Sequence, residues 1–199
     1  MKNTVKRIMA LAMAAIMLLA FTGCSPEKKA EKAVTSFLTA LKNVEIEEAG
    51  KYINTDASTE SDFASGDKKI FAEKIFGKME YEILSSEAVS DTEVKVSLNI
   101  TNVDMKPVLG EFMMQALQYA FSNMSADPAP TEEEMEAKYM EILTECLAKD
   151  DLATVTNEVE VTVVDVNGEW KVNVEETFAN AMLGGLSDAA KELQNSFAG

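Results

Sequence analysis

The sequence EVKVSLNITNVDMKPV, residues 93–108, joins a strand pattern to the start of a helix. Its first half alternates polar residues with four apolar ones: Val94, Val96, Leu98 and Ile100. A period of two is typical of an antiparallel strand that has one buried face and one face in water. Asp104 is a good N-cap for the helix that follows, and Pro107 falls in the first turn, where proline is tolerated. This stretch therefore predicts a half-buried strand that leads directly into a helix.

The residues after this junction predict a helical hairpin over residues 105–149. Apolar residues recur at helical spacing through its first helix, residues 105–124: Val108, Leu109, Phe112, Met113, Leu117, Ala120, Phe121 and Met124. The sequence SADPAP interrupts this helix, and Thr131 with Glu134 matches a capping box that opens a second helix to about Lys149. Two helices of similar length with a short break between them indicate an antiparallel pair.

Strand patterns lie on both sides of the hairpin. Tyr81 and Ile83 alternate with acids before it, and valines alternate after it up to Asn167-Gly168, a strong two-residue hairpin turn. Helical patterns occupy much of the remaining chain, at residues 27–42, 45–53, 70–77, 175–183 and 187–197. The predicted fold class is α+β, an antiparallel sheet packed on helices with the helical hairpin inserted between strands.

The N-terminus has the pattern of a secretory signal peptide. Lys2, Lys6 and Arg7 precede an almost wholly apolar stretch, residues 8–21, and small residues follow before Cys24. The stretch is shorter than the roughly 20 apolar residues that a membrane-spanning helix needs. The basic residues are placed to stay on the cytoplasmic side of the membrane. We therefore predict that residues 1–23 direct export.

The sequence LLAFTGC at the end of this segment resembles a bacterial lipobox, whose cysteine becomes the lipid-carrying N-terminus. Thr22 and Gly23 match that pattern, and Phe21 stands where leucine is usual. The alternative is ordinary signal-peptide cleavage, for which threonine at the cut is a weak choice. The resemblance implies that Cys24 is acylated and that the bilayer is a partner of the chain. The protein would then lie on the extracytoplasmic face of the cell membrane, with residues 24–32 as a lipidated tether and residues 33–199 as one α+β domain.

Composition excludes several classes of function. Without residues 1–23 the chain has 199 − 23 = 176 residues and a net charge of 15 − 34 = −19, which repels nucleic acid. It then has no arginine and no histidine, so it lacks guanidinium forks for phosphate, imidazole bases and imidazole metal ligands. We predict no cofactor, no metal site, no nucleic-acid partner and no catalytic residue. Cys146 lies on the apolar side of the second hairpin helix and is expected to be a buried thiol.

Three short sequences carry a resemblance to a known family. These are VTSFLTALKN, ITNVDMKPV and NGEWKV, at residues 34–43, 100–108 and 167–172. With the order of elements, they resemble Gram-positive lipoproteins of unknown function that contain a nuclear-transport-factor-like, or cystatin-like, domain. The resemblance implies a cone in which a curved antiparallel sheet wraps a long helix and can leave a pocket. Homodimers that form through the sheet are common in that fold, and the sequence does not decide whether one forms here.

Four residues are candidates for lining such a pocket. The alternation that buries every second residue from 94 to 100 continues to Asn102 and Asp104, so both would lie on the buried face. A carboxylate at the mouth of a pocket could act as a general base. Tyr81 and Trp170 could stack on a ligand. The alternative is structural, with Asp104 as a helix cap, Asn102 at a strand end and both aromatic rings in the core.

The predicted function is a non-catalytic ligand-binding or interaction module at the cell surface. One alternative is a cone-fold enzyme that uses a pocket carboxylate such as Asp104. Another is an accessory lipoprotein that binds a protein partner through the hairpin at residues 105–149. Six of the eight methionines after residue 23 lie between Met105 and Met140, where they could fill a core or form an adaptable binding surface. Met114 is the one that falls off the apolar stripe.

Overall fold

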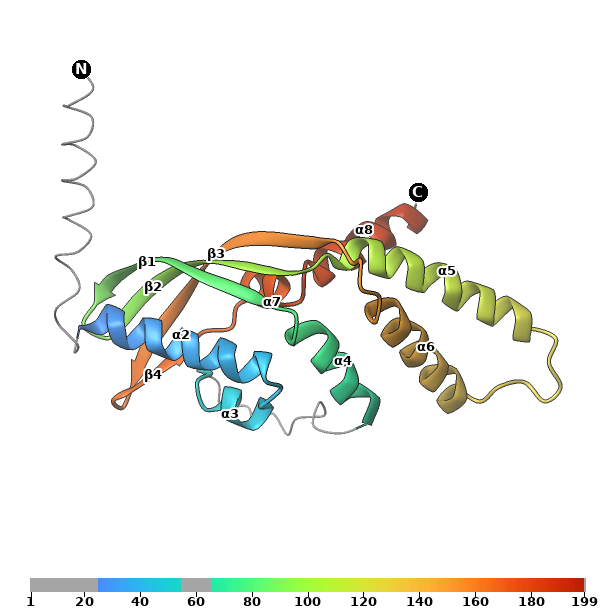
Figure 1. Ribbon diagram of the computed structural model, residues 1–199, viewed down its shortest axis with the longest axis horizontal. Helices are drawn as coiled ribbons and strands as arrows, with labels where there is room; N and C mark the ends of the chain where they lie inside the picture. The colour runs from blue at the N-terminus through green and yellow to red at the C-terminus, as the bar shows by residue number, and fades with distance from the viewer. Residues whose placement is uncertain (1–24, 55–65, 199) are drawn as a thin grey trace, which may run out of the picture.

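A computed structural model describes residues 25–54 and 66–198 and has an α+β fold (Figure 1). Four strands form one curved antiparallel sheet, and helices pack on it and extend beyond it. In chain order the elements are α2 (Pro26–Lys42), α3 (Ile46–Gly50), α4 (Gly66–Phe76), β1 (Glu80–Ser90), β2 (Glu93–Val103), α5 (Met105–Asn123), α6 (Glu132–Leu147), β3 (Thr154–Val166), β4 (Glu169–Val172), α7 (Glu176–Met182) and α8 (Leu186–Ala198).

The strands lie in the order β1-β2-β3-β4, and each pairs antiparallel with its neighbour. Strands β2 and β3 pair without a break from Glu93 opposite Val164 to Val103 opposite Thr154. The helices α5 and α6 therefore leave and rejoin the sheet at the same end of this pair. This confirms the predicted fold class, including the helical hairpin inserted between strands.

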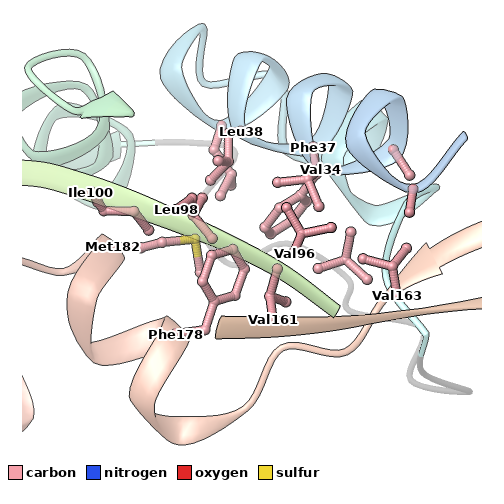
Figure 2. Packing of buried hydrophobic residues seen from close by; sticks show 14 of the residues in the cluster. Val34, Phe37, Leu38, Val96, Leu98, Ile100, Val161, Val163, Phe178 and Met182 are labelled. Carbon is pink, nitrogen blue, oxygen red and sulfur yellow. The ribbon is translucent and has the colours of Figure 1, made fainter. Parts of the chain in front are cut away.

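The first of two cores lies between one face of the sheet and helices α2 and α7. The strand residues that the alternation predicted to be buried, Val94, Val96, Leu98 and Ile100, are fully buried. Figure 2 shows side chains of α2 and α7 meeting those of β2 and β3, and the rings of Phe37 and Phe178 are 6.1 Å apart. Since burying one Val, Leu or Phe side chain contributes about 1.5–3 kcal/mol, this layer holds the helices on the sheet.

The second core lies where the hairpin joins the body. Its buried residues come from α4, the end of β2, α5 and α6: Ile75, Val103, Met105, Val108, Ile142, Cys146 and Leu147. Phe76 packs against both cores. The hairpin is therefore fixed to the body at its base, whereas its tip extends away from the sheet (Figure 1).

The structure differs from the predicted tether at residues 24–32. Helix α2 already begins at Pro26, and Ala30 is fully buried in the first core. Ser25 is the N-cap, since its side chain accepts a hydrogen bond from the Lys28 amide. Pro26 and Glu27 in the first turn also suit a helix start. The polar composition of this stretch belongs to the exposed side of a helix.

Gly184 makes a close contact that joins the end of α7 to the β2–α5 junction. Its φ is +60°, and a Cβ at this position would collide with the carbonyl oxygen of Val103. Its own carbonyl accepts a hydrogen bond of 3.0 Å from the Met105 amide. Only glycine combines this backbone conformation with such a close approach.

We predict that Gly184→Ala destabilises the protein by more than about 2 kcal/mol, because a left-handed residue with a Cβ costs about 1–2 kcal/mol before the collision is counted. Urea denaturation measures this change. The matched control is Gly110→Ala in the interior of α5, where a Cβ meets nothing within 4 Å and alanine should stabilise by up to about 1 kcal/mol. Equal effects of the two substitutions would contradict the assignment.

Candidate functional site

Asn102, a predicted pocket residue, joins strand β2 to helix α7. It is 1% exposed and is the buried polar residue of the described core. Its Nδ2 donates a hydrogen bond of 2.6 Å to the carbonyl of Met182, and its Oδ1 accepts one of 2.7 Å from the Val103 amide. Both ends of the amide are therefore occupied by backbone groups, which gives Asn102 a structural role.

Asp104 caps helix α5, as one reading of the sequence predicted. Its Oδ1 accepts a hydrogen bond of 3.0 Å from the Lys106 amide, and its backbone is extended, as an N-cap requires. Its own amide donates to the carbonyl of Ala153, 2.8 Å away, across the base of the hairpin. The hydrogen bond from the Lys106 amide accounts for the position of the Asp104 carboxylate, so no substrate is needed to explain it.

Tyr81 and Trp170 lie on opposite edge strands of the sheet. The Tyr81 hydroxyl is 3.0 Å from Thr39 Oγ1 and joins β1 to the C-terminal part of α2. Trp170 lies on β4, is 9% exposed and lines a cleft near the start of α2. The structure does not bring the four predicted residues together, because Asn102 and Asp104 lie at the hairpin end of β2. Cys24, the predicted lipidation site, lies outside the described residues.

Helix α5 carries an exposed apolar surface, although the sequence pattern assigned Leu117, Phe121 and Met124 to its buried side. Leu117, Phe121 and Met124 are 43%, 67% and 78% exposed, and Met114 is 70% exposed. The residues of α5 that are buried instead are Met105, Val108 and Ala116. We call Met114, Leu117, Phe121 and Met124 the α5 stripe. Their spacing of three, four and three residues places them on one side of the helix.

The opposite side of α5 packs against α6, which explains why the stripe is left exposed. The rings of Phe112 and Tyr119 meet Tyr139 edge to face, with centroids 6.4 and 6.3 Å apart. Lys149 Nζ donates to Glu111, with both distances between 2.5 and 2.6 Å. The hydrogen bond from Lys149 holds the pKa of the Glu111 carboxyl below its usual range. These contacts fix the rotation of α5, so the α5 stripe faces away from α6.

Cys146 is buried in the contact between α5 and α6, as the sequence predicted. Gln115 Nε2 lies 3.6 Å from its sulfur. Burial raises the pKa of the Cys146 thiol, which favours its protonated form.

An apolar groove runs along α6 near the hairpin tip. Its volume is about 430 Å³, and its apolar lining includes Phe112, Met135, Tyr139, Met140 and Leu143. Glu132 and Glu136 line it as well. The hairpin therefore presents two apolar surfaces, the α5 stripe and this acid-flanked groove, which the sequence analysis did not separate.

Residues 25–54 and 66–198 contain no group of three or more acidic, Cys or His side chains placed to hold a metal ion. In the same residues, no helix combines the length and the apolar character needed to cross a membrane.

Comparison with known proteins gives only weak similarity, to solved structures. No protein-family model matches the chain, and no curated protein matches it. One of these structures is that of a "putative lipoprotein (ycdA)" from Bacillus subtilis, with 16% sequence identity and a TM-score of 0.44. The match covers 78% of this chain and 46% of that protein, so this chain spans about half its length. At this level of similarity, no property of that protein is transferred to this chain.

We predict that Asn102→Ala destabilises the fold by about 1–3 kcal/mol, because it leaves the buried Met182 carbonyl without its donor. The free energy of unfolding from urea denaturation measures the effect. The control is Asn99→Ala on the same strand, whose side chain lies on the opposite face and should change stability by less than about 0.5 kcal/mol. If Asn102→Ala were as stable as the parent, Asn102 would be free for a ligand and the structural role would be wrong.

Proposed function

We propose that this protein is a lipid-anchored extracytoplasmic binding protein that holds a protein partner through its helical hairpin. The anchor is supported by the sequence: the basic residues Lys2, Lys6 and Arg7, the apolar stretch at residues 8–21 and Cys24 after it. Two acyl chains on Cys24 would hold the protein stably at the membrane. Pro26, the second residue after Cys24, is the first residue of α2. The folded body would therefore begin directly at the membrane surface.

The exposed α5 stripe is the observation that carries the binding role. Exposed apolar residues gathered on one surface of a soluble domain are typical of interaction sites. The stripe extends about 15 Å along the helix, and its alternating spacing of three and four residues is that of a coiled-coil seam. Its two methionines are flexible and can adapt to a partner surface. This geometry favours an amphipathic helix as the partner element.

Charge favours a partner other than a second copy of the chain. Residues 105–149 carry three lysines and eight acids, a net charge of 3 − 8 = −5. The two charged residues of α5 are both paired, Lys106 with Glu192 and Glu111 with Lys149. A partner helix with an apolar face and basic flanks would contact the uncharged stripe, and its basic side chains would be attracted to the acidic side chains of α6. Two copies of the negatively charged chain would instead repel one another.

The position of the hairpin also supports this role. The start of α2 and the tip of the hairpin lie at opposite ends of the long axis of the molecule (Figure 1). In a body anchored at Cys24, the α5 stripe would therefore lie at the end far from the point of attachment. Asp104 has no catalytic role in this proposal, because its carboxylate caps α5.

We predict that Cys24→Ala abolishes labelling by radioactive fatty acid and releases the protein into the medium, because the acyl chains are its hold on the bilayer. Metabolic labelling and fractionation of the native host measure both effects. A Ser25→Ala variant, which keeps the cysteine, is the control and should stay labelled and membrane-bound. Membrane retention of the unlabelled Cys24→Ala protein would contradict the lipid anchor.

We predict that the double substitution Met114→Gln and Phe121→Gln removes partner binding and leaves stability within about 0.5 kcal/mol, because both side chains are exposed. A photo-crosslinking residue in place of Gln118, beside the stripe, should give one discrete adduct in the native host. The double variant should lose that adduct, and Ser122→Gln, exposed on the same helix but off the stripe, should keep it.

The same crosslinker in place of Glu133 on α6 tests specificity. Equal adducts from positions 118 and 133, or an adduct that survives the double substitution, would contradict binding through the stripe. An adduct with twice the mass of the chain would identify a second copy instead of a separate partner.

A further inference from the structure

A cleft of about 600 Å³ lies between the start of α2 and the β3–β4 turn and is lined by four lysines. Lys29 and Lys32 come from α2, Lys51 follows α3 and Lys171 lies on β4. Lys29 and Lys32 are three residues apart, so both project from the same side of α2. The other lining residues include Tyr52, Glu169 and Trp170. We call this site the lysine cleft.

The lysine cleft is positive in a strongly negative chain. Its four lysines and one glutamate sum to 4 − 1 = +3, whereas the whole chain carries −16. Lys51 is 2.5 Å from Glu48 and Lys171 is 2.6 Å from Glu169, so two of the lysines are paired. Lys29 and Lys32 are exposed and have no ion-pair partner within residues 25–54 and 66–198. Two cations thus remain available for an external anion, although in the whole chain acidic residues outnumber basic ones almost two to one.

Trp170 provides a second, independent feature of this cleft. It is 9% exposed and forms part of the lining, and its Nε1–H is buried with no acceptor among the described residues. A buried indole N–H usually has a hydrogen-bond partner, so this donor is an exception. The unpaired ammonium groups of Lys29 and Lys32 suit an anion with several oxygen atoms, such as a phosphate, and Trp170 forms part of the lining of the same cleft.

We propose that the lysine cleft binds the phosphate of an anionic phospholipid headgroup in the membrane that holds Cys24. This proposal rests on the lipid anchor of the proposed function. Lys29 and Lys32 lie about 5 and 9 Å from Pro26 along the axis of α2, since each residue of a helix rises about 1.5 Å. These spacings are close to the Debye length of about 8 Å at physiological salt, so both lysines would feel the negative potential of anionic lipids.

The headgroup contact gives the anchor an orientation. An acyl chain alone holds a protein at the membrane without fixing which side of it faces the lipid. The lysine cleft adds a second attachment, formed by α2, β4 and the turn between β3 and β4. With both attachments made, this end of the molecule lies against the bilayer and the hairpin points away from it (Figure 1).

Trp170 allows a direct test, because it is the single tryptophan of the chain. The acylated protein is reconstituted into vesicles of phosphatidylcholine with increasing amounts of phosphatidylglycerol, and Trp170 emission is recorded. We expect an emission change that depends on phosphatidylglycerol and is lost in about 1 M salt. In the double variant Lys29→Gln and Lys32→Gln, the phosphatidylglycerol needed for half of the change should rise about 25-fold, about fivefold for each lysine.

A charge-matched control separates the cleft from general attraction. Lys42→Gln with Lys69→Gln removes two exposed lysines at other positions, on α2 and α4, and should leave the response unchanged. Melting temperatures of both double variants check that each is folded. An equal response to phosphatidylcholine and phosphatidylglycerol, or equal losses in the two double variants, would overturn the proposal. Saturation by inorganic phosphate at millimolar concentration without anionic lipid would also overturn it, since the ligand would then be a free anion.

Two comparisons distinguish this proposal from the proposed function on which it rests. The stripe variant Met114→Gln with Phe121→Gln should keep the full Trp170 response, because it alters the opposite end of the molecule. The protein from residue 24 onward, with Cys24→Ser in place of the acylated cysteine, should still float with phosphatidylglycerol vesicles and not with phosphatidylcholine vesicles. If the acylated protein floats with both and the Cys24→Ser chain with neither, the anchor is correct and the headgroup site is wrong.

Discussion

The unbroken pairing of β2 with β3 is the constraint on which the rest of the structure depends. It places Val94 and Val96 of β2 opposite Val163 and Val161 of β3 on one face, where α2 and α7 bury them. It also brings the two ends of the long hairpin insertion together, so that the Asp104 amide reaches the Ala153 carbonyl and the Met105 amide reaches Gly184. Without this register, the hairpin would have no fixed base and the second core would not form.

The distribution of charge gives the two ends of the molecule different properties. The chain is strongly acidic, yet α5 has no unpaired charge and the lysine cleft is positive. At one end, the lack of charge allows an apolar partner to approach the α5 stripe. At the other, unpaired lysines beside the start of α2 suit a negatively charged membrane surface. A body of this shape would connect a bilayer to a partner held away from it.

The sequence was less informative about sites than about elements. It marked Asn102 and Asp104 as pocket candidates because they continue the buried phase of a strand, but both side chains bond to backbone groups at the base of the hairpin. Trp170 does line a cleft, together with lysines from α2 and from the segment after α3. Those lysines are distant in sequence, so no local pattern could assemble them.

The sequence alone determined the strand alternation, the Asp104 cap, the Thr131–Glu134 capping box and the Asn167-Gly168 turn, because each depends on neighbours within a few residues. It also determined the hairpin insertion, since its helical spacing separates two strand patterns. Tertiary structure decided which side of α5 is buried. The apolar residues of α5 surround more of the helix than one partner can cover, and the contacts of Phe112, Tyr119 and Glu111 with α6 select one rotation. The α5 stripe is exposed because that rotation leaves it no neighbour to pack against among residues 25–54 and 66–198.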